Sequence, residues 1–224
     1  MSGDWDVTCA ILQTTDERAD RLLRQFPMAS PMQQGAEHVV RRRKLAQALL
    51  QDLLNRAIGR GPWTIVSGEN GKPLIAERAG EPAFGISLTH GGNLVGVAIS
   101  NIGAVGLDIE PHGRERDLAG IARYAFGPRE QQTVAQGGVT AFYRIWTLRE
   151  AIGKATGEGL ALVTDGIDRI ASGPEEGAWA QDDGRWLLLH RHLGAASLAL
   201  AVRACGPAAA ARWSSARIRW EGLA

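Results

Sequence analysis

The sequence predicts a mixed α/β protein, and two observations indicate this class. Short apolar stretches alternate with period two as in strands, whereas longer segments repeat apolar residues at helical spacing, and the order strand, helices, strands occurs twice. The 224 residues are 45% hydrophobic and 22% charged, which is typical of a globular protein. A chain of this length fits one large domain or two of about a hundred residues each. We place the boundary between the two segments near residues 101–104.

The first segment is predicted to begin with a strand and two helices. A strand over Val7 to Leu12 precedes a helix that runs to Phe26, with Thr14 and Glu17 as a capping box at its start. Apolar residues at helical spacing then predict a long amphipathic helix from Gln34 to Ile58. A loop-rich stretch follows.

Three strands are predicted in the centre of the chain, over Phe84 to Thr89, Leu94 to Ile99 and Ala104 to Glu110. Because short runs of turn residues separate them, we expect a three-stranded meander. Residues 116–157 are predicted to be helical, with breaks at 127–128 and 137–138. The tail is predicted to return to strands at Gly166 to Ile170, Arg185 to Arg191 and Ser197 to Arg203.

Charge and composition exclude several classes of protein. With Lys+Arg 25 against Asp+Glu 24 the formal net charge is +1, which argues against nucleic acid or an anionic membrane as partner. Cys9 and Cys205 have no CxxC or histidine cluster beside them, so neither a disulfide framework nor a zinc site is predicted. No apolar run reaches the roughly 20 residues of a spanning helix, and the first residues lack a signal peptide's basic region. We therefore expect a soluble cytoplasmic protein.

Two carboxylates emerge on one face of the predicted strand that ends at Glu110. The apolar residues of this strand share one face, so Asp108 and Glu110 lie on the other, about 7 Å apart at Cα. A solvated polar strand face is the commoner cause of such a pattern, and a divalent cation between the carboxylates is the alternative. Gly106 lies on the acidic face and leaves room for a ligand or another backbone.

A second group of charges continues an apolar row of the predicted helix. Steps of four residues give the row Phe142, Trp146, Glu150 and Lys154. On an outward face the last two would be an ordinary surface salt bridge, but this row points them toward the packed side, where an ion pair needs a cleft or a partner. Together with Asp108 and Glu110, Glu150 would complete a site of three carboxylates, which suits Mg²⁺ holding phosphate oxygens, with Lys154 beside it.

Cationic groups in the first segment fit the same kind of site. His90 ends a strand, Lys72 lies in a Gly-Lys-Pro loop, and Arg41, Arg42 and Arg43 lie near the start of a helix. Taken singly, these are a turn residue, a loop lysine and a solvated helix face. Taken together, they are the inventory that a diphosphate with a further phosphate group requires.

Five motifs occur in order between about residues 40 and 170. They are Gly71-Lys72-Pro73, Ile86-Ser87-Leu88-Thr89-His90, Gly106-Leu107-Asp108-Ile109-Glu110, the segment from Trp146 to Lys154 and Gly157-Glu158-Gly159-Leu160. In these motifs the chain resembles the Sfp-type 4′-phosphopantetheinyl transferase family. Two residues depart from the family pattern: Arg149 replaces a lysine and keeps the charge, and Thr89 replaces a serine and keeps the hydroxyl.

The resemblance implies a fold of two similar halves, residues 1–103 and 104–224, related by a pseudo-twofold axis. Each half would be a small, mainly antiparallel sheet packed with helices, and coenzyme A would bind in the cleft between them. The first half would contact the nucleotide and phosphates, and the second would carry the metal and the catalytic residues. Because one chain would already build the cleft, the resemblance also implies a monomer.

The implied reaction is transfer of the 4′-phosphopantetheine arm of coenzyme A to a serine of an apo acyl- or peptidyl-carrier protein, with release of 3′,5′-ADP. Such carriers serve fatty acid, polyketide or nonribosomal peptide biosynthesis. The two other functions we consider are a Mg²⁺-dependent phosphohydrolase of a small phosphate ester and a catalytically idle module that only binds carrier proteins.

The resemblance also implies a role for each site residue. Asp108, Glu110 and Glu150 would hold Mg²⁺ on the diphosphate, and Glu150 would be the general base for the serine. Lys154 would neutralise the leaving phosphate. Lys154 therefore also counts as a contact to coenzyme A, and so does Asp108. The remaining predicted contacts to its phosphates are Thr89, His90, Lys72 and Arg43.

Overall fold

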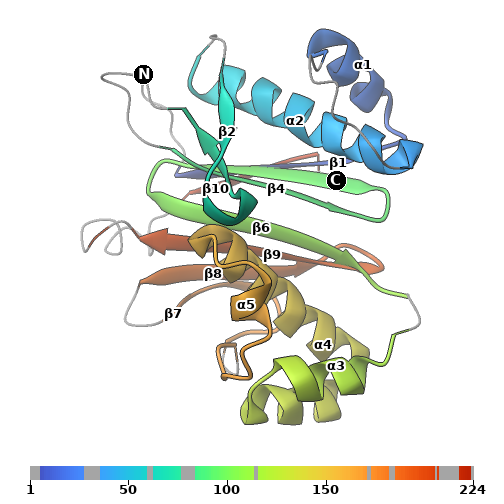
Figure 1. Ribbon diagram of the computed structural model, residues 1–224, viewed down its shortest axis with the longest axis vertical. Coiled ribbons are helices and arrows are strands. Elements are labelled where there is room, and N and C mark those ends of the chain that lie inside the picture. Colours follow the sequence, from blue (N-terminus) through green and yellow to red (C-terminus); the bar gives the residue numbers. More distant parts are fainter. Residues whose placement is uncertain are drawn as a thin grey trace.

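The structure is a computed structural model that describes residues 6–27, 36–59, 63–76, 84–113, 116–170, 173–181, 185–204, 206 and 217–222. These residues form four layers, with a helical layer outside each of two sheets (Figure 1). The mixed α/β class predicted from the sequence is confirmed. Cys9 is buried and has a free thiol, whereas Cys205 and the first five residues lie outside the described residues.

The elements of the first half bring a long helix onto the first sheet. They are β1 (Val7–Gln13), α1 (Glu17–Gln25), α2 (Glu37–Ala57), β2 (Ile65–Ser67), the 3-10 turn η1 (Glu69–Gly71), β3 (Pro73–Ile75), β4 (Gly85–Gly91) and β5 (Leu94–Ser100). The predicted capping box at Thr14 is wrong, because the carboxylate of Asp16 accepts the N–H of Arg18 and caps α1.

The second half repeats this plan with a longer helix. Its elements are β6 (Gly103–Pro111), α3 (Leu118–Ala125), α4 (Pro128–Thr156), α5 (Leu160–Val163), β7 (Gly177–Gln181), β8 (Trp186–His192), β9 (Ala196–Ala204) and β10 (Ile218–Glu221). Gly138 has non-helical backbone angles inside α4, at one of the two predicted breaks. Among the described helices, none is both long and apolar enough to cross a bilayer.

The two four-stranded sheets have the orders β10-β1-β5-β4 and β6-β9-β8-β7. The predicted three-stranded meander is wrong, because β5 lies between β1 and β4 and has no free edge for β6, which pairs with β9 instead. All pairings in both sheets are antiparallel except that of β10, which runs parallel to β1. Because β10 returns to the first sheet, the boundary between residues 103 and 104 stays a prediction.

Three apolar cores hold the four layers together. One lies between the first sheet and helices α1 and α2, and the second lies between the second sheet and helices α3 and α4. The third lies between the two sheets and includes Leu107 and Ile109 of β6. Because these apolar side chains of β6 face this middle core, Asp108 and Glu110 face the side of α4.

The strand predicted at Gly166 to Ile170 is wrong, because side-chain carboxylates bind the backbone N–H groups of this segment. Asp165 accepts the N–H of Ile167, and Glu130 accepts those of Arg169 and Ile170. These donors are therefore not available for a strand ladder.

Gly106 lets the backbone of α4 lie directly on β6. A Cβ atom at this position would lie 1.8 Å from the carbonyl oxygen of Ala151 and 2.7 Å from the amide nitrogen of Ala155. The room expected beside Gly106 is therefore occupied by another backbone. This contact sets the distance between β6 and the helix that carries Glu150 and Lys154.

Replacing Gly106 with alanine is expected to lower the free energy of unfolding by about 2–4 kcal/mol, because α4 must move away from the sheet. Urea unfolding measures this loss. Gly206→Ala is the control, since a Cβ atom there meets nothing within 4 Å. Equal stability of the two variants would contradict the close packing of α4 on β6.

Candidate active site

The site lies where β4 and β6, the edge strands of the two sheets, run side by side without a backbone ladder. The hydroxyl of Ser87 accepts the N–H of Leu107 at 3.0 Å, and the hydroxyl of Thr89 accepts the N–H of Ile109 at 3.3 Å. Both hydroxyl-bearing residues are buried. Side-chain hydroxyls thus replace backbone carbonyls at this junction between the sheets.

A cleft of about 550 Å³ opens beside this junction. Its lining includes seven residues predicted from the sequence, namely Arg43, Thr89, His90, Asp108, Glu110, Glu150 and Lys154. Residues of α2, β4, β6 and α4 therefore meet in one cavity, although they are far apart in the sequence. Of the predicted site residues, only Lys72 does not line it.

Lys154 connects the two sides of the cleft. Its ammonium group donates to Asp108 Oδ1 at 2.6 Å, to the hydroxyl of Thr89 at 3.1 Å and to the carbonyl of Leu107 at 3.1 Å. The side chain is 30% exposed and that of Asp108 only 7%. An ion pair at this depth is held by its hydrogen bonds as well as by charge.

The three carboxylates repel one another across the cleft. Burial, together with the charge of Asp108, raises the pKa of Glu110. The same causes raise the pKa of Glu150 to about 7, with Glu110 as a further negative neighbour. Asp108 Oδ2 is buried and has no hydrogen-bond partner. Within the described ranges, no three acidic, histidine or cysteine side chains already form a metal cluster.

Basic side chains lie in and beside the same cleft. Burial lowers the pKa of His90, and the charges of Arg42, Lys154 and Arg43 lower it further. Arg42 donates to the carbonyl of Gly92, and Arg41 binds Asp20. Of the three consecutive arginines, Arg43 is the one that lines the cleft.

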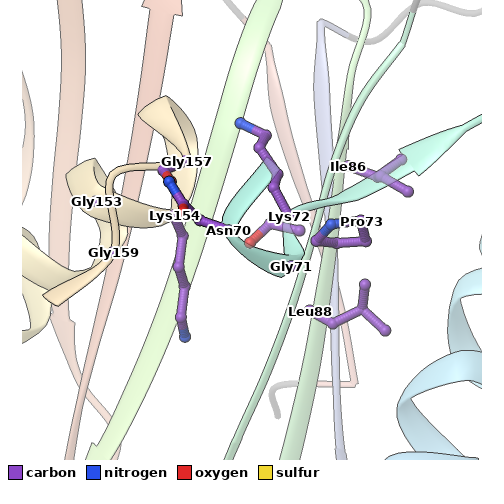
Figure 2. A pocket seen from close by; sticks show the side chains of 11 residues that line it. Asn70, Gly71, Lys72, Pro73, Ile86, Leu88, Gly153, Lys154, Gly157 and Gly159 are labelled. Carbon is purple, nitrogen blue, oxygen red and sulfur yellow. The ribbon is translucent and has the colours of Figure 1, made fainter. Parts of the chain in front are cut away.

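Lys72 lies beside the cleft and not in it. It lines a smaller cavity of about 200 Å³, shown in Figure 2, where its side chain and that of Lys154 extend in opposite directions. The ammonium group of Lys72 donates to the carbonyl of Ala155 near the C-terminal end of α4. The predicted phosphate contact of Lys72 therefore stays a prediction, and the contact that the residue makes is with a helix.

Arg149 is a buried organising residue, whereas in the sequence it stood out only as a departure from the family pattern. Its side chain is fully buried and forms salt bridges with Glu130 at 2.8 Å and Asp165 at 2.7 Å. It also donates to four backbone carbonyls, those of Ala125, Leu162, Val163 and Ile167. A guanidinium can serve so many acceptors because its five donors form a fixed planar fork. The segment after α4 is thereby held to the helix next to Glu150.

Comparison with known proteins agrees with this geometry. Residues 104–203 match the family model of the 4′-phosphopantetheinyl transferase superfamily, a stretch that includes Asp108, Glu110, Glu150 and Lys154. Over these residues the chain therefore carries a domain similar to those of this superfamily.

Several relatives with the same description are similar to the chain. One is the 4′-phosphopantetheinyl transferase HetI of Nostoc sp. (strain PCC 7120), 30% identical over 155 residues, which are 66% of this chain and 65% of the relative. Another is AcpT of Salmonella typhi, 37% identical over 110 residues, 47% of this chain and 55% of the relative. A third is psf-1 of Bacillus pumilus, 34% identical over 96 residues, 41% of this chain and 39% of the relative. The chain thus spans less than two thirds of each relative.

The family pattern has lysine at the position of Arg149. Replacing Arg149 with lysine is expected to lower the free energy of unfolding by about 3–5 kcal/mol. One ammonium group cannot reach both carboxylates and the four carbonyls, so buried acceptors lose their donors. Chemical denaturation gives the value. Arg123→Lys, at a 69% exposed side chain, should change it by less than about 0.5 kcal/mol. A stable, unchanged R149K protein would refute this role.

In metal-free protein, replacing Glu150 with glutamine is expected to stabilise the fold at alkaline pH. Burial and neighbouring carboxylates raise the pKa of Glu150 from 4.5 to about 7 on folding. The stability contributed by such a group is present below the unfolded value and is lost as the pH rises through the folded value. E150Q should therefore exceed wild type by about 1–3 kcal/mol at pH 8 and match it at pH 4.

Urea unfolding in EDTA at both pH values tests this prediction. Glu17→Gln, at a 95% exposed side chain, serves as the control and should show no such pH-dependent difference. If E150Q and wild type were equally stable at pH 8, the repulsion described for the three carboxylates would be refuted.

Proposed function

We propose that this protein transfers the 4′-phosphopantetheine arm of coenzyme A to a serine hydroxyl of an apo carrier protein and releases 3′,5′-ADP. The observation that carries the proposal is that carboxylates and basic side chains line one cleft. Asp108, Glu110 and Glu150 line the same cavity as Arg43, His90 and Lys154. A diphosphate needs cations and hydrogen-bond donors, and a metal ion on that diphosphate needs carboxylates.

The three carboxylates fit Mg²⁺ as the cofactor. Their donors are oxygens only, Asp108 Oδ2 is buried without a partner, and the repulsion that raises the pKa of Glu150 is the kind that a divalent cation relieves. We assign Asp108, Glu110 and Glu150 as the residues that would hold it. When bound, Mg²⁺ would neutralise negative charge on the diphosphate.

Glu150 is the residue we assign as general base. The incoming serine oxygen forms a bond to the phosphorus that bears the pantetheine arm, and the serine proton passes to the Glu150 carboxylate. The bond from this phosphorus to the bridging oxygen breaks, and its electron pair leaves on the phosphate of 3′,5′-ADP. A carboxylate with a pKa near neutrality can both accept this proton and release it after turnover.

Lys154 and the other basic residues of the cleft would hold the phosphates during this step. The ammonium group of Lys154 already contacts Thr89 and Asp108, so it can stabilise charge that develops on the leaving phosphate without a large movement. Thr89 and His90 lie at the end of β4 and would contact phosphate oxygens. Arg43 would bind the 3′-phosphate as a charge-assisted contact.

The protein partner and its setting belong to the same proposal. The second substrate would be an acyl- or peptidyl-carrier protein of fatty acid, polyketide or nonribosomal peptide biosynthesis, in the cytoplasm. A monomer is sufficient for this reaction, because residues of both halves of one chain line the cleft.

The test is incubation of the full chain with coenzyme A, Mg²⁺ and an apo carrier protein. A mass increase of about 340 Da on the carrier is expected, and EDTA should prevent it. E150Q should lose about a hundredfold or more in rate while remaining folded, since the serine proton then has no acceptor. Mass spectrometry of the carrier and circular dichroism of the variant measure the two effects.

Three outcomes would contradict the proposal. Normal transfer by folded E150Q would refute the assignment of the base. Release of phosphate from small esters without any carrier would favour a phosphohydrolase. Carrier binding without a change of mass would favour an idle binding module.

A further inference from the structure

We propose that Asn70 and Lys72 form a clasp on the C-terminal end of α4, residues 153–159, and that this clasp positions Lys154. In this inference Lys72 is a positioning residue and not a phosphate ligand. Its effect on turnover rests on the function proposed above, whereas its effect on the helix end does not.

The clasp consists of two hydrogen bonds from the first half to the second. The ammonium group of Lys72 donates to the carbonyl of Ala155, and the side-chain amide of Asn70 donates to the carbonyl of Gly157 at 2.9 Å. Both donors come from the short turn between β2 and β3. Among the described residues, Asn70 is the only one other than glycine with a positive φ, 53°. Asparagine adopts this left-handed conformation more readily than most residues, and here it forms part of the tight turn between the two strands.

The acceptors are groups that a helix cannot satisfy by itself. The last four carbonyls of an α-helix have no partner within the helix, and they carry the negative end of its dipole. Ala155 is in the last turn of α4, and Gly157 follows as a left-handed cap with φ 84°. A lysine at this end therefore supplies both a hydrogen bond and a favourable charge. Lys72 is partly buried, and this burial lowers the pKa of its ammonium group.

Packing on β6 fixes one side of this helix end at Ala151 and Ala155, but the side that faces the first half is less filled. A cavity of about 200 Å³ lies between the turn and the helix end, and Figure 2 shows Gly153, Gly157 and Gly159 facing Asn70 and Lys72 there. Three glycines present no side chains that could fill such a space. The polar contacts of the clasp are therefore a main restraint on residues 153–159 from the first half.

The restraint acts directly on the catalytic side of α4. Lys154 precedes Ala155 in the chain, and its ammonium group reaches Thr89 and Asp108. Gly71 and Pro73 of the same turn line the substrate cleft, on both sides of Lys72 in the sequence. One short turn thus touches the cleft with its backbone and holds the helix with its side chains.

Two coenzymes distinguish the clasp from a phosphate contact. Lys72→Met is expected to lower kcat about tenfold with little change in KM. The loss in kcat should be the same with coenzyme A and with 3′-dephospho-coenzyme A. Arg43→Met, at the residue assigned to the 3′-phosphate, should raise KM for coenzyme A alone and serves as the contrasting control. A loss in Lys72→Met that is confined to coenzyme A would overturn the inference and restore the phosphate role.

A second measurement needs no activity. Hydrogen–deuterium exchange of the backbone amides in 153–159 should be about threefold or more faster in Lys72→Met and in Asn70→Ala than in wild type. It should be unchanged in Arg21→Met, a charge removal at a 62% exposed side chain on α1. Unchanged exchange in both clasp variants would refute the clasp. If Lys72→Met does not fold, Asn70→Ala alone decides the question.

The two proposals can fail separately. If the wild-type chain transferred nothing to any carrier, the proposed function would fall, and the exchange rates would still support or refute the clasp. If wild type transferred normally and both clasp variants kept full kcat and unchanged exchange, the clasp would fall while the function stood.

Discussion

The two sheets meet at one junction on which the candidate site depends, the contact between β4 and β6. Edge strands that approach in this way need partners for their backbone donors, and Ser87 and Thr89 supply them with buried hydroxyls. The approach is close enough that a Cβ atom at Gly91 would lie 2.4 Å from the carbonyl oxygen of Ile109. Because the strands touch through hydroxyls, Thr89 stands beside Asp108, and groups from both halves can face one cleft.

The charges of the cleft illustrate how a site can oppose the stability of its own fold. Glu110 and Glu150 are half-buried near Asp108, which raises their pKa values, while burial and, to a lesser extent, nearby cations lower the pKa of His90. A free energy cost of this kind persists because the surrounding structure is held elsewhere. Here Arg149 is part of that support, since it links the last part of α4 to Glu130 near the start of the same helix and to Asp165 after α5.

Sequence patterns predicted what depends on local periodicity. The alternation of apolar and polar residues placed Asp108 and Glu110 on one face of a strand, and the four-residue spacing placed Glu150 and Lys154 in one row of a helix. In the structure all four residues line one cleft. Contacts between distant segments were not predictable in this way. The N–H groups of 169 and 170 are bound by Glu130, about forty residues earlier, and β10 pairs with β1 from the other end of the chain. Likewise, three adjacent arginines differ only by rotation around α2, and tertiary contacts decide that Arg43 lines the cleft.

The two halves are also coupled at the end of α4. Lys154 reaches across to Thr89 of the first sheet, and the next residue, Ala155, accepts Lys72 from the turn between β2 and β3. Two consecutive residues of one helix are therefore hydrogen-bonded to the first half. Lys154 is a donor through its side chain, and Ala155 is an acceptor through its backbone carbonyl. These contacts restrict the ammonium group of Lys154 relative to Asp108, as the role proposed for it in phosphoryl transfer requires.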